Sequence, residues 1–390
     1  MKKNKKNYVL MSFIIFSLMI TGCSYGEEEI KEDQRPKPKG AYINVEDDVA
    51  AAEASAIYPI SGFPAAFALN VPAIGDQQQT EECVSFSLAY YIMGFYNGVQ
   101  GGTTNEDLSG SPQFLYTMYK SINANDSDCK SGVFMFDVPS ANIKGLANVA
   151  IDKGTCSYKE LPLTETGCSP YPTASQIAAA AANKPGGIFR LENHQYSSVE
   201  NLKSWLYSGF PVWFCVPINE KWTMAGKYYI WSNSEGENVG GHAMTVVGWD
   251  DTKQAFKIAN SWGEQWGDHG FGWISYSYFS HLIQNGNGDI AIVAPNTAQQ
   301  NHTNTIAPGS CQNSQTGSID FKNTTAHNLT ISITTGGKTV KVIVNPGNSG
   351  RIIGLPAGAI TAKAYTNQNT VYQTYDITLS PCQTAYHVIS

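Results

Sequence analysis

Apolar residues along the chain predict helices first and strands afterwards. Over 84–96 they recur at the three-to-four-residue spacing of one helical face, and Asn97-Gly98 then provides a typical helix stop. The residues on this face are Phe86, Ala89, Tyr90 and Met93. A second helical pattern covers 141–152, and from 209 to 293 the pattern is that of strands.

A change in composition separates this region from the C-terminal residues. Asn, Gln, Thr and Ser dominate 298–317, which we predict to be a linker. In 318–390 apolar and polar residues alternate, as in Leu329, Ile331 and Ile333, and glycine and proline pairs punctuate the alternation. About six short strands are expected there, which predicts a small β-sandwich domain. We recognise no catalytic constellation in it.

The first residues have the pattern of a targeting segment. A lysine-rich start precedes an uncharged, mostly apolar run over 8–20, which is too short for a membrane span of roughly 20 residues. The run ends in Leu18-Met19-Ile20-Thr21-Gly22-Cys23, which resembles the lipobox of bacterial lipoproteins. The resemblance implies that 1–22 is a signal peptide and that Cys23 is lipidated and anchors an exported chain to a bacterial membrane. The alternative is an ordinary signal peptide with an incidental cysteine.

Residues 23–58 are predicted to be a tether, because charge and proline dominate 31–39 and an alanine-rich stretch follows. Acidic residues directly behind Cys23, in Gly26-Glu27-Glu28-Glu29, resemble a surface-export tag of some Gram-negative bacteria. That resemblance implies exposure at the outer membrane, and a solvated acidic tether is the alternative.

The charge balance argues against one class of partner. The net charge is −7, and no basic stripe occurs along the chain. Nucleic acid is therefore not an expected partner.

Three motifs hold a cysteine, a histidine and an asparagine, in that order. They are Gln77-Gln78-Gln79-Thr80-Glu81-Glu82-Cys83-Val84-Ser85-Phe86-Ser87, Gly241-His242-Ala243-Met244-Thr245-Val246-Val247-Gly248-Trp249 and Asn260-Ser261-Trp262-Gly263-Glu264-Gln265-Trp266-Gly267. Together they resemble the active site of papain-like cysteine proteases. The resemblance implies an α+β, two-lobed papain-like fold over 59–297. A helical lobe would precede a β-barrel-like lobe, with nucleophile and base on opposite walls of a cleft.

These residue types suit catalysis by a thiol. Only the thiolate is reactive, so a base such as His242 must take the proton of Cys83. An amide such as that of Asn260 can orient the imidazole through its oxygen. Cys83 lies in the first turn of the predicted helix, where the positive end of the helix dipole favours a thiolate, and Thr80 can cap that helix.

The spacing of the second and third motifs adds a separate argument. Strands over 241–249 and 255–260 flank a polar turn, which predicts a hairpin centred on Asp251. Such a hairpin places His242 opposite Asn260, because 242 and 260 lie nine residues to either side of 251. Directly opposed side chains are about 4.5–5.5 Å apart at Cβ, although the register could slip by a residue.

The resemblance also assigns supporting residues. Gln77 stands where the family has its oxyanion-hole amide, and a loop glutamine is the alternative. Trp262 resembles the tryptophan that covers the hydrogen bond between asparagine and histidine, whereas Trp266 is expected in the core. The other six histidines have no comparable context or metal-ligand spacing, and no metal or organic cofactor is expected.

Several residues depart from the family pattern. Glu81 and Glu82 replace the small residues that usually precede the nucleophile, and their carboxylates are expected to raise the pKa of the thiol. Val84 replaces an aromatic residue, and Thr80 stands where a disulfide cysteine is common. The usual Gly-Gly wall for substrate is not evident, and Ser131-Gly132 is its candidate. The tether is also too short for the family's helical inhibitory propeptide.

An exported chain tolerates disulfides. We predict one between Cys311 and Cys382, because they flank the strands of the C-terminal domain, and a second between Cys129 and Cys168. Cys215 lies in a strongly apolar strand pattern and is expected to be a buried thiol without a disulfide. Sequence alone does not fix the connectivity.

The resemblance implies a peptidase that acts on peptide or protein substrates through a Cys-His-Asn acyl-enzyme mechanism. One alternative is a papain-like scaffold that is weakly active or inactive and serves binding or adhesion, for which Glu81 and Glu82 are the motive. Another is a different acyl transfer on the same triad, such as transglutamination or exopeptidase trimming. Substrate preference and oligomeric state are not predicted.

Overall fold

A computed structural model describes residues 40–42, 54–58, 62–99, 102–191, 198–296, 299 and 314–390. The predicted signal peptide, Cys23 and its acidic neighbours, and most of the predicted tether and linker lie outside these residues. Within the described residues, none of the helices combines the length and apolar character needed to cross a bilayer.

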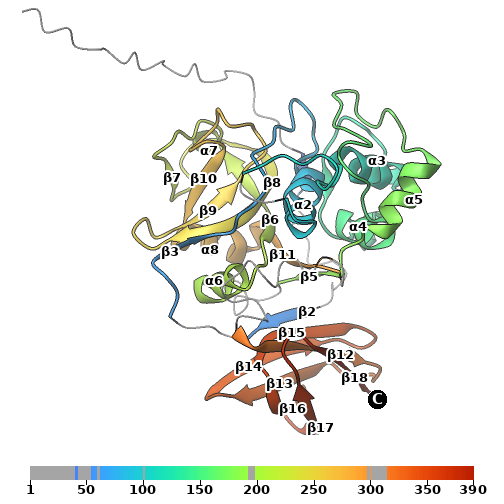
Figure 1. Cartoon of the computed structure of the whole chain (residues 1–390), viewed down its shortest axis with the longest axis vertical. Coiled ribbons are helices and arrows are strands. Elements are labelled where there is room, and N and C mark those ends of the chain that lie inside the picture. Colours follow the sequence, from blue (N-terminus) through green and yellow to red (C-terminus); the bar gives the residue numbers. More distant parts are fainter. Residues whose placement is uncertain are drawn as a thin grey trace, which may run out of the picture. The chain divides into compact units, whose positions relative to one another are not determined.

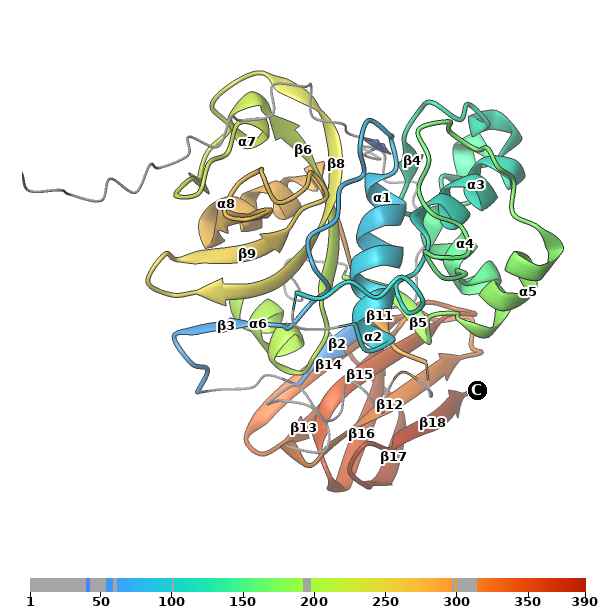
Figure 2. The same ribbon diagram turned by 45° about the horizontal axis from the view of Figure 1, so that its top comes forward.

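The helix that begins at Cys83 runs between the β-sheet and the helices of residues 112–182 (Figures 1 and 2). It consists of α1 (Cys83–Ser85), a π-helical segment η1 (Phe86–Met93) and α2 (Gly94–Tyr96). Every residue of the three segments is buried, so the helix packs on all sides and not only along the predicted apolar face. The predicted stop is confirmed, because Asn97 is the C-cap and Gly98 has φ of 97°.

The predicted N-cap of this helix is wrong. Glu82 occupies the cap position without a side-chain hydrogen bond to the helix. Thr80 instead donates its hydroxyl hydrogen to the carbonyl oxygen of Gln77, at 2.7 Å. The hydroxyl therefore stabilises the turn that precedes the helix.

Two further helices build the helical lobe. In α3 (Pro112–Ile122) the hydroxyl of Ser111 caps the first turn by accepting a hydrogen bond from the Phe114 nitrogen. The helix predicted over 141–152 begins later, as α4 (Leu146–Lys153), because a 3-10 turn and Gly145 precede it. The remaining helical segments are η2 (Ala124–Asp126), η3 (Pro139–Ala141), α5 (Ala174–Ala182), α6 (Val199–Tyr207), α7 (Glu220–Thr223), α8 (Tyr276–Leu282) and η4 (Ile283–Asn287).

The β part is built on the long strand β8 (Asn238–Asp250), which carries His242. The strand order is β5-β11-β6-β8-β9-β10-β7, antiparallel except between β10 and β7, and β3 also pairs with β8. The other bounds are β3 (Ala66–Ala68), β5 (Gly187–Arg190), β6 (Val212–Asn219), β7 (Ile230–Trp231), β9 (Ala255–Ala259), β10 (Phe271–Ser275) and β11 (Asp289–Ala294).

The hairpin formed by β8 and β9 has a different register from the predicted one. Thr245 pairs with Ala259 and Asp250 pairs with Ala255, with an irregularity after Val246. Continuing the first pairing would place Asn260 opposite Met244 and not opposite His242. The prediction of direct opposition is therefore wrong by two residues. Because side chains alternate along a strand, positions 242 and 244 share one face, so the asparagine remains on the face of the histidine.

Two segments of the predicted tether are strands that pair with other parts of the chain. The first, β1 (Ala41–Tyr42), pairs in parallel with β4 (Val133–Phe134) and in antiparallel fashion with Gly241 of β8. The second, β2 (Ala54–Ile57), pairs in parallel with β15 (Ser349–Pro356), a strand of the C-terminal region.

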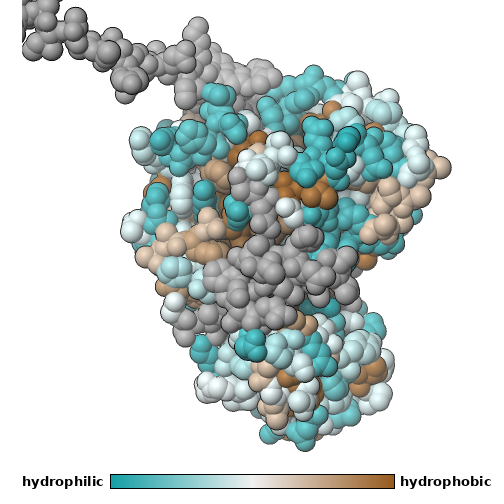
Figure 3. Space-filling model, viewed as in Figure 1, coloured by the Kyte–Doolittle hydropathy of each residue, from teal (hydrophilic) through white to brown (hydrophobic). Residues whose placement is uncertain are grey.

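The C-terminal strands form two sheets around a separate apolar core. The strands β18-β12-β15 form one end of the large sheet and connect through β2 to β5, whereas β14-β13-β16-β17 form a separate sheet. The alternation in the sequence is reproduced, since Leu329, Ile331 and Ile333 are fully buried. The surface of the C-terminal strands mixes hydrophilic and hydrophobic residues on the face shown in Figure 3. The bounds are β12 (Thr316–Asn323), β13 (Leu329–Thr335), β14 (Lys338–Val344), β16 (Gly358–Thr366), β17 (Val371–Leu379) and β18 (Thr384–Ile389).

The described cysteines agree with two of the sequence predictions. Cys129 and Cys168 form a disulfide with Cα atoms 5.4 Å apart. Cys215 is a buried thiol without a disulfide. Cys382 is disulfide-bonded as well. Its predicted partner, Cys311, lies outside the described residues, so that pairing stays a prediction.

Candidate active site

The thiol of Cys83 lies against the strand that carries His242. The main-chain nitrogen of Ala243, the residue after the histidine, donates a hydrogen bond to Sγ of Cys83 at 3.4 Å. Cys83 is also the first residue of its helix, where main-chain N–H groups have no partner within the helix. The helix start and β8 thus bring the cysteine and the histidine of the first two motifs together.

The imidazole of His242 is held by the third motif. Its Nε2 lies 2.7 Å from Oδ1 of Asn260. The same Oδ1 accepts a hydrogen bond from the main-chain nitrogen of Ser261 at 2.9 Å, which identifies it as the acceptor. Nε2 must therefore carry the hydrogen of the His242–Asn260 bond, and in the neutral ring Nδ1 is then the basic nitrogen.

Trp262 covers this pair as the resemblance implies. Its ring stacks on the imidazole with centroids 4.5 Å apart and an interplanar angle of 22°. Trp262, His242 and Asn260 are all buried, so the His242–Asn260 hydrogen bond is shielded from water. Trp266 packs edge-on against Trp262 in the core, as expected.

Gln77 is fixed beside the third motif. Its main-chain nitrogen donates to the carbonyl oxygen of Ser261 at 2.8 Å, and its Oε1 accepts from the Ser261 hydroxyl at 2.5 Å. Its Nε2 donates one hydrogen to the carbonyl oxygen of Thr80 at 2.8 Å. A side-chain amide carries two such hydrogens, so a second N–H can serve an oxyanion. Gln77 of the first motif is thus hydrogen-bonded to Ser261 of the third motif, although the two residues are far apart in the sequence.

The two glutamates before the nucleophile differ from each other. Burial is the main cause that raises the pKa of Cys83, and the negative charge of Glu81 raises it further. The N–H groups of Ala243 and Val84 act in the opposite direction. Glu82 is fully buried, and neither carboxylate oxygen has a hydrogen-bond partner. Burial raises the pKa of Glu82 well above its ordinary value. Glu82 therefore carries less charge than an exposed glutamate would.

The strand β1 borders this site. Gly40 donates its N–H to the carbonyl oxygen of Gly241 at 3.4 Å and accepts a hydrogen bond from the Val133 nitrogen at 2.8 Å. A Cβ on Gly40 would lie only 2.1 Å from the carbonyl oxygen of Glu81. Residues 40–42 thus run between the residue that precedes His242 and the Ser131-Gly132 segment, and Cys83 is fully buried. The sequence analysis had placed them in the tether.

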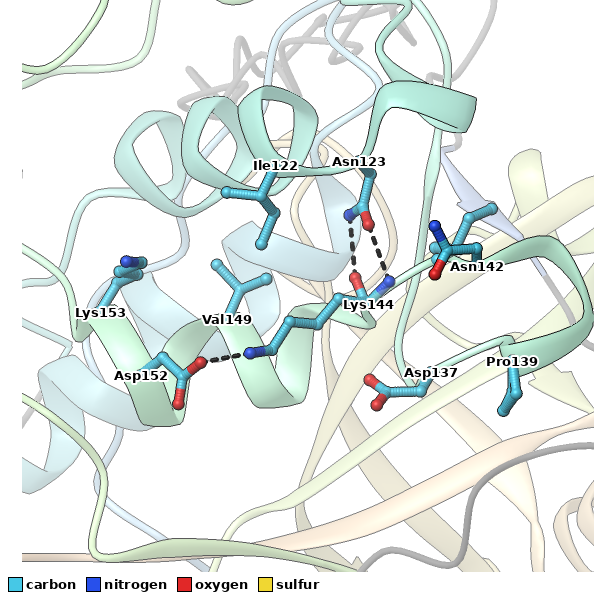
Figure 4. A pocket seen from close by; sticks show the side chains of 10 residues that line it. Ile122, Asn123, Asp137, Pro139, Asn142, Lys144, Val149, Asp152 and Lys153 are labelled. Atoms are coloured by element: carbon cyan, nitrogen blue, oxygen red, sulfur yellow. Dashed lines mark hydrogen bonds and ion pairs between the residues drawn. The ribbon is translucent and has the colours of Figure 1, made fainter.

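Two cavities lie in or near the helical lobe. One of about 330 Å³ adjoins the segment before the nucleophile and is lined by Gln79, Thr80, Glu81, Glu82, Tyr116, Cys129, Lys130, Glu165, Thr166 and Gly167. A larger one, of about 590 Å³, is lined by residues at the end of α3 and by α4 (Figure 4). There Asn123 makes two hydrogen bonds with the main chain of Lys144, whose ammonium pairs with Asp152, so these polar groups satisfy one another.

The other described histidines have contacts of their own or lie in loops, and His269 directly precedes Gly270, whose carbonyl oxygen accepts a hydrogen bond from the Asn260 nitrogen. His281 contacts Asn285, and His387 packs against Tyr375. His194 and His302 lie outside the described residues. Among the described residues, no group of three or more His, Cys, Asp or Glu side chains is arranged to hold a metal ion.

The arrangement of helix and sheet is that of a known fold. Xylellain, a cysteine protease from Xylella fastidiosa, superposes with a TM-score of 0.51 at 21% sequence identity. The alignment covers 66% of this chain and 96% of that protein. The chain therefore has the papain-like α+β fold, with additional β-sheet structure beyond it.

Sequence relationships identify the family. The family model described as "Papain family cysteine protease" matches residues 66–287, which are more than half of the chain. An uncharacterized peptidase C1-like protein of Acanthamoeba polyphaga mimivirus is 34% identical over 85 residues, which are 20% of this chain and 27% of that protein. A gut-specific cysteine proteinase of Caenorhabditis elegans is 27% identical over 150 residues, which are 37% of this chain and 42% of that protein. The chain belongs to the papain family of cysteine proteases.

Two features of the structure are not predicted by the sequence. The first is β1, for which the only signal was the short apolar pair Ala41-Tyr42 within a tether-like composition. The second is the buried position of Lys120, which a helical pattern does not distinguish from an exposed lysine. Both depend on contacts between residues far apart in the sequence.

Proposed function

We propose that this protein is a cysteine peptidase that hydrolyses peptide bonds through Cys83, His242 and Asn260. The observation that carries the proposal is the 2.7 Å contact between Nε2 of His242 and Oδ1 of Asn260, beside a thiol at a helix start. Family membership supports the same reading and favours it over the binding-scaffold alternative.

The geometry supports the following sequence of steps. Nδ1 of His242 takes the proton of Cys83, and the thiolate attacks the substrate carbonyl carbon to form a tetrahedral intermediate. The second N–H of Gln77 and the main-chain N–H of Cys83 would stabilise the negative oxygen. The protonated imidazole then gives its proton to the leaving amine, and an acyl-enzyme remains. Water, activated by the same imidazole, hydrolyses the thioester and restores the thiol.

We infer that this structure is a closed state of the enzyme. Cys83 has no exposed surface, and burial raises the pKa of its thiol. Residues 40–42 must leave their place between Gly241 and Val133 before a substrate can reach the thiol. The proposed activity therefore requires a second, open state.

The test uses a thiol-reactive peptide electrophile and a library of fluorogenic peptides. We expect mass spectrometry to place the label on Cys83, and Cys83→Ala to lose both labelling and hydrolysis. Product analysis separates internal cleavage from terminal trimming or transglutamination. A wild-type protein that neither labels nor cleaves would favour the binding-scaffold alternative.

We also propose that the protein is exported and lipid-anchored through Cys23, because a lipobox-like motif ends at that residue. Exposure at the surface of an outer membrane is the further proposal from the acidic residues behind it. Intact-mass measurement of the mature protein tests the anchor. An N-terminus at Cys23 with added lipid mass is expected, and Cys23→Ala should move the protein out of the membrane fraction. A mature N-terminus elsewhere without lipid mass contradicts the proposal.

A further inference from the structure

Lys120 is a buried lysine in the helical lobe. Only 2% of its surface is exposed, although it lies on α3, whose sequence pattern does not mark it as internal. Its ammonium makes three hydrogen bonds: to Oδ1 of Asp126 at 2.7 Å, to the Ser131 hydroxyl at 2.9 Å and to the carbonyl oxygen of Gly132 at 2.7 Å. An ammonium has three hydrogens, so its donors are all used.

Two tyrosines of α3 act on the same loop. Tyr116 donates its hydroxyl hydrogen to the carbonyl oxygen of Ser131 at 2.7 Å. Tyr119 donates to Oδ2 of Asp126 at 2.7 Å and accepts from the Phe134 nitrogen at 3.3 Å. With Lys120, the helix therefore holds the main chain of 131–134 at several successive residues.

The loop that is held in this way pairs with the chain's own strand β1. The nitrogen of Val133 donates to the carbonyl oxygen of Gly40, and Ala41 and Tyr42 continue the pairing with β4. The ring of Tyr42 lies 4.9 Å from that of Phe134. The chain's own strand shows that this edge accepts an extended peptide beside the nucleophile, in the manner of strand addition.

We propose that Lys120 is a positioning residue for substrate, which holds 131–133 so that the Val133 N–H faces a carbonyl oxygen of the bound peptide. This inference rests on the proposed peptidase function. Lys120 contacts neither the substrate nor the triad, and it acts through the carbonyl oxygen of Gly132 and the hydroxyl of Ser131.

A lysine that served only the stability of the fold would not need this arrangement. Its pairing with Asp126 uses one hydrogen, and the other two are directed at the residues immediately before Val133. Burial lowers the pKa of Lys120 and Asp126 opposes that effect, so desolvating the ammonium has a cost. A role in fixing residues 131–133 for pairing with a peptide accounts for the buried position of Lys120.

The experiment is made in the full chain with Gly40→Ala, because the added methyl group collides with Glu81 and removes β1 as an internal competitor. In that background, Lys120→Met is combined with Asp126→Asn, which avoids leaving a buried carboxylate unpaired. We expect KM for fluorogenic peptides to rise about tenfold, with kcat changed by less than about twofold, because the lost interaction serves binding. Lys144→Met, which removes an exposed ion pair nearby, is the matched control and should change neither constant.

A readout tied to one hydrogen bond separates positioning from a structural role. A single thioamide is placed at each position of the peptide in turn. In the Gly40→Ala protein one position should raise KM, because there the thioamide sulfur, a weaker acceptor than oxygen, faces the Val133 N–H. In the Lys120 variant this penalty should shrink, while alkylation of Cys83 by a small reagent keeps its rate. Unchanged KM, or equal losses in kcat and alkylation at constant KM, would overturn the inference.

Failure of the proposed function is distinguished by a binding measurement. Calorimetry with the Cys83→Ala form of the same background reports peptide affinity without turnover. If no peptide is hydrolysed but affinity falls about tenfold on changing Lys120, the inference stands and the peptidase proposal fails. If affinity is the same with and without Lys120, the inference fails.

Discussion

Oδ1 of Asn260 lies 2.7 Å from Nε2 of His242, although the two residues are not opposed in the hairpin. Asn260 follows the last residue of β9 and lies opposite Met244, which is two residues from His242 on the same face of β8. A diagonal neighbour of this kind is within reach of a polar side chain. The strand pairing alone does not fix the ring of His242, so in the proposed mechanism this contact orients it.

We expect Asn260→Ala to be less damaging than the loss of the nucleophile or the base. Cys83→Ala and His242→Ala should each remove nearly all turnover, because residues of a triad act as a unit. Without Asn260 the ring of His242 is still packed against Trp262 and can still reach the thiol. Steady-state hydrolysis of one fluorogenic peptide by the three variants is the measurement. Equal losses in all three would assign Asn260 a role beyond orientation.

The hairpin also shows how far sequence reasoning reached. The identities of the motifs predicted that the cysteine, histidine and asparagine segments meet, and the apolar pattern predicted the strands on which two of them lie. The register was missed because the turn is displaced toward Thr252 and an irregularity follows Val246, and neither has a signal in the residues. The alternation of side chains preserved the outcome despite the two-residue error.

Gln77→Ala should lower kcat by about 10²–10³, the typical cost of losing one oxyanion donor. Its effect on alkylation of Cys83 should be small, because the amide acts on the developing negative oxygen and not on the thiol. Ser261→Ala is the informative companion, since it removes the hydroxyl that holds Oε1 at 2.5 Å. A smaller loss of the same kind is expected. If alkylation slows as much as turnover in Gln77→Ala, the residue supports the thiol and not the oxyanion.

Gly40→Ala should open the site. The strand that covers Cys83 would lose its place, because the methyl group meets the Glu81 carbonyl and the backbone has φ of 148°, where side chains are strained. We expect alkylation of Cys83 by a small reagent to accelerate about tenfold, as a larger fraction of molecules is competent. Gly62→Ala, also at positive φ but with nothing within 4 Å, is the matched control. Equal rates in wild type and Gly40→Ala would show that β1 does not restrict the thiol.

The N-terminal segment and Lys120 were beyond sequence reasoning for a common physical reason. Strand addition depends on main-chain hydrogen bonds, which almost any short sequence can make, so Ala41-Tyr42 carries little signal. A buried lysine is recognisable only from its acceptors, and two of these are a main-chain oxygen and a hydroxyl contributed by the loop after α3. The charged, proline-rich and alanine-rich composition predicted a tether, whereas 41–42 and 54–57 are strands that pair with other parts of the chain.

Glu81→Gln should lower the pH at which Cys83 becomes alkylable. The negative charge of Glu81 raises the pKa of the thiol, so neutralising it stabilises the thiolate. Glu82→Gln is the comparison, and its effect should be smaller because the raised pKa of Glu82 already reduces its charge. Alkylation rates across pH, measured in the Gly40→Ala background, give the two shifts. A larger shift from Glu82 than from Glu81 would reverse the assignment.

Glu82→Gln should instead change how stability depends on pH. The folded-state pKa of Glu82 lies well above the unfolded value, so folding favours the protonated carboxyl. Its contribution is fully present below the unfolded pKa and is lost as pH rises toward the folded pKa. Each pH unit in that window costs about 1.4 kcal/mol of unfolding free energy. The glutamine variant carries no such charge and should therefore gain on wild type as pH rises.

Urea unfolding of wild type and Glu82→Gln at several pH values from about 4 to 8 measures the difference. The two proteins should be closest in stability at the acidic end, because the wild-type carboxyl is then protonated in both states. The gap should widen toward neutral pH in favour of the glutamine. Glu264→Gln, at an exposed position of the third motif, is the control and should not reproduce this trend. A constant gap across the range would mean that Glu82 does not retain its proton on folding, and that its carboxylate has a partner in solution.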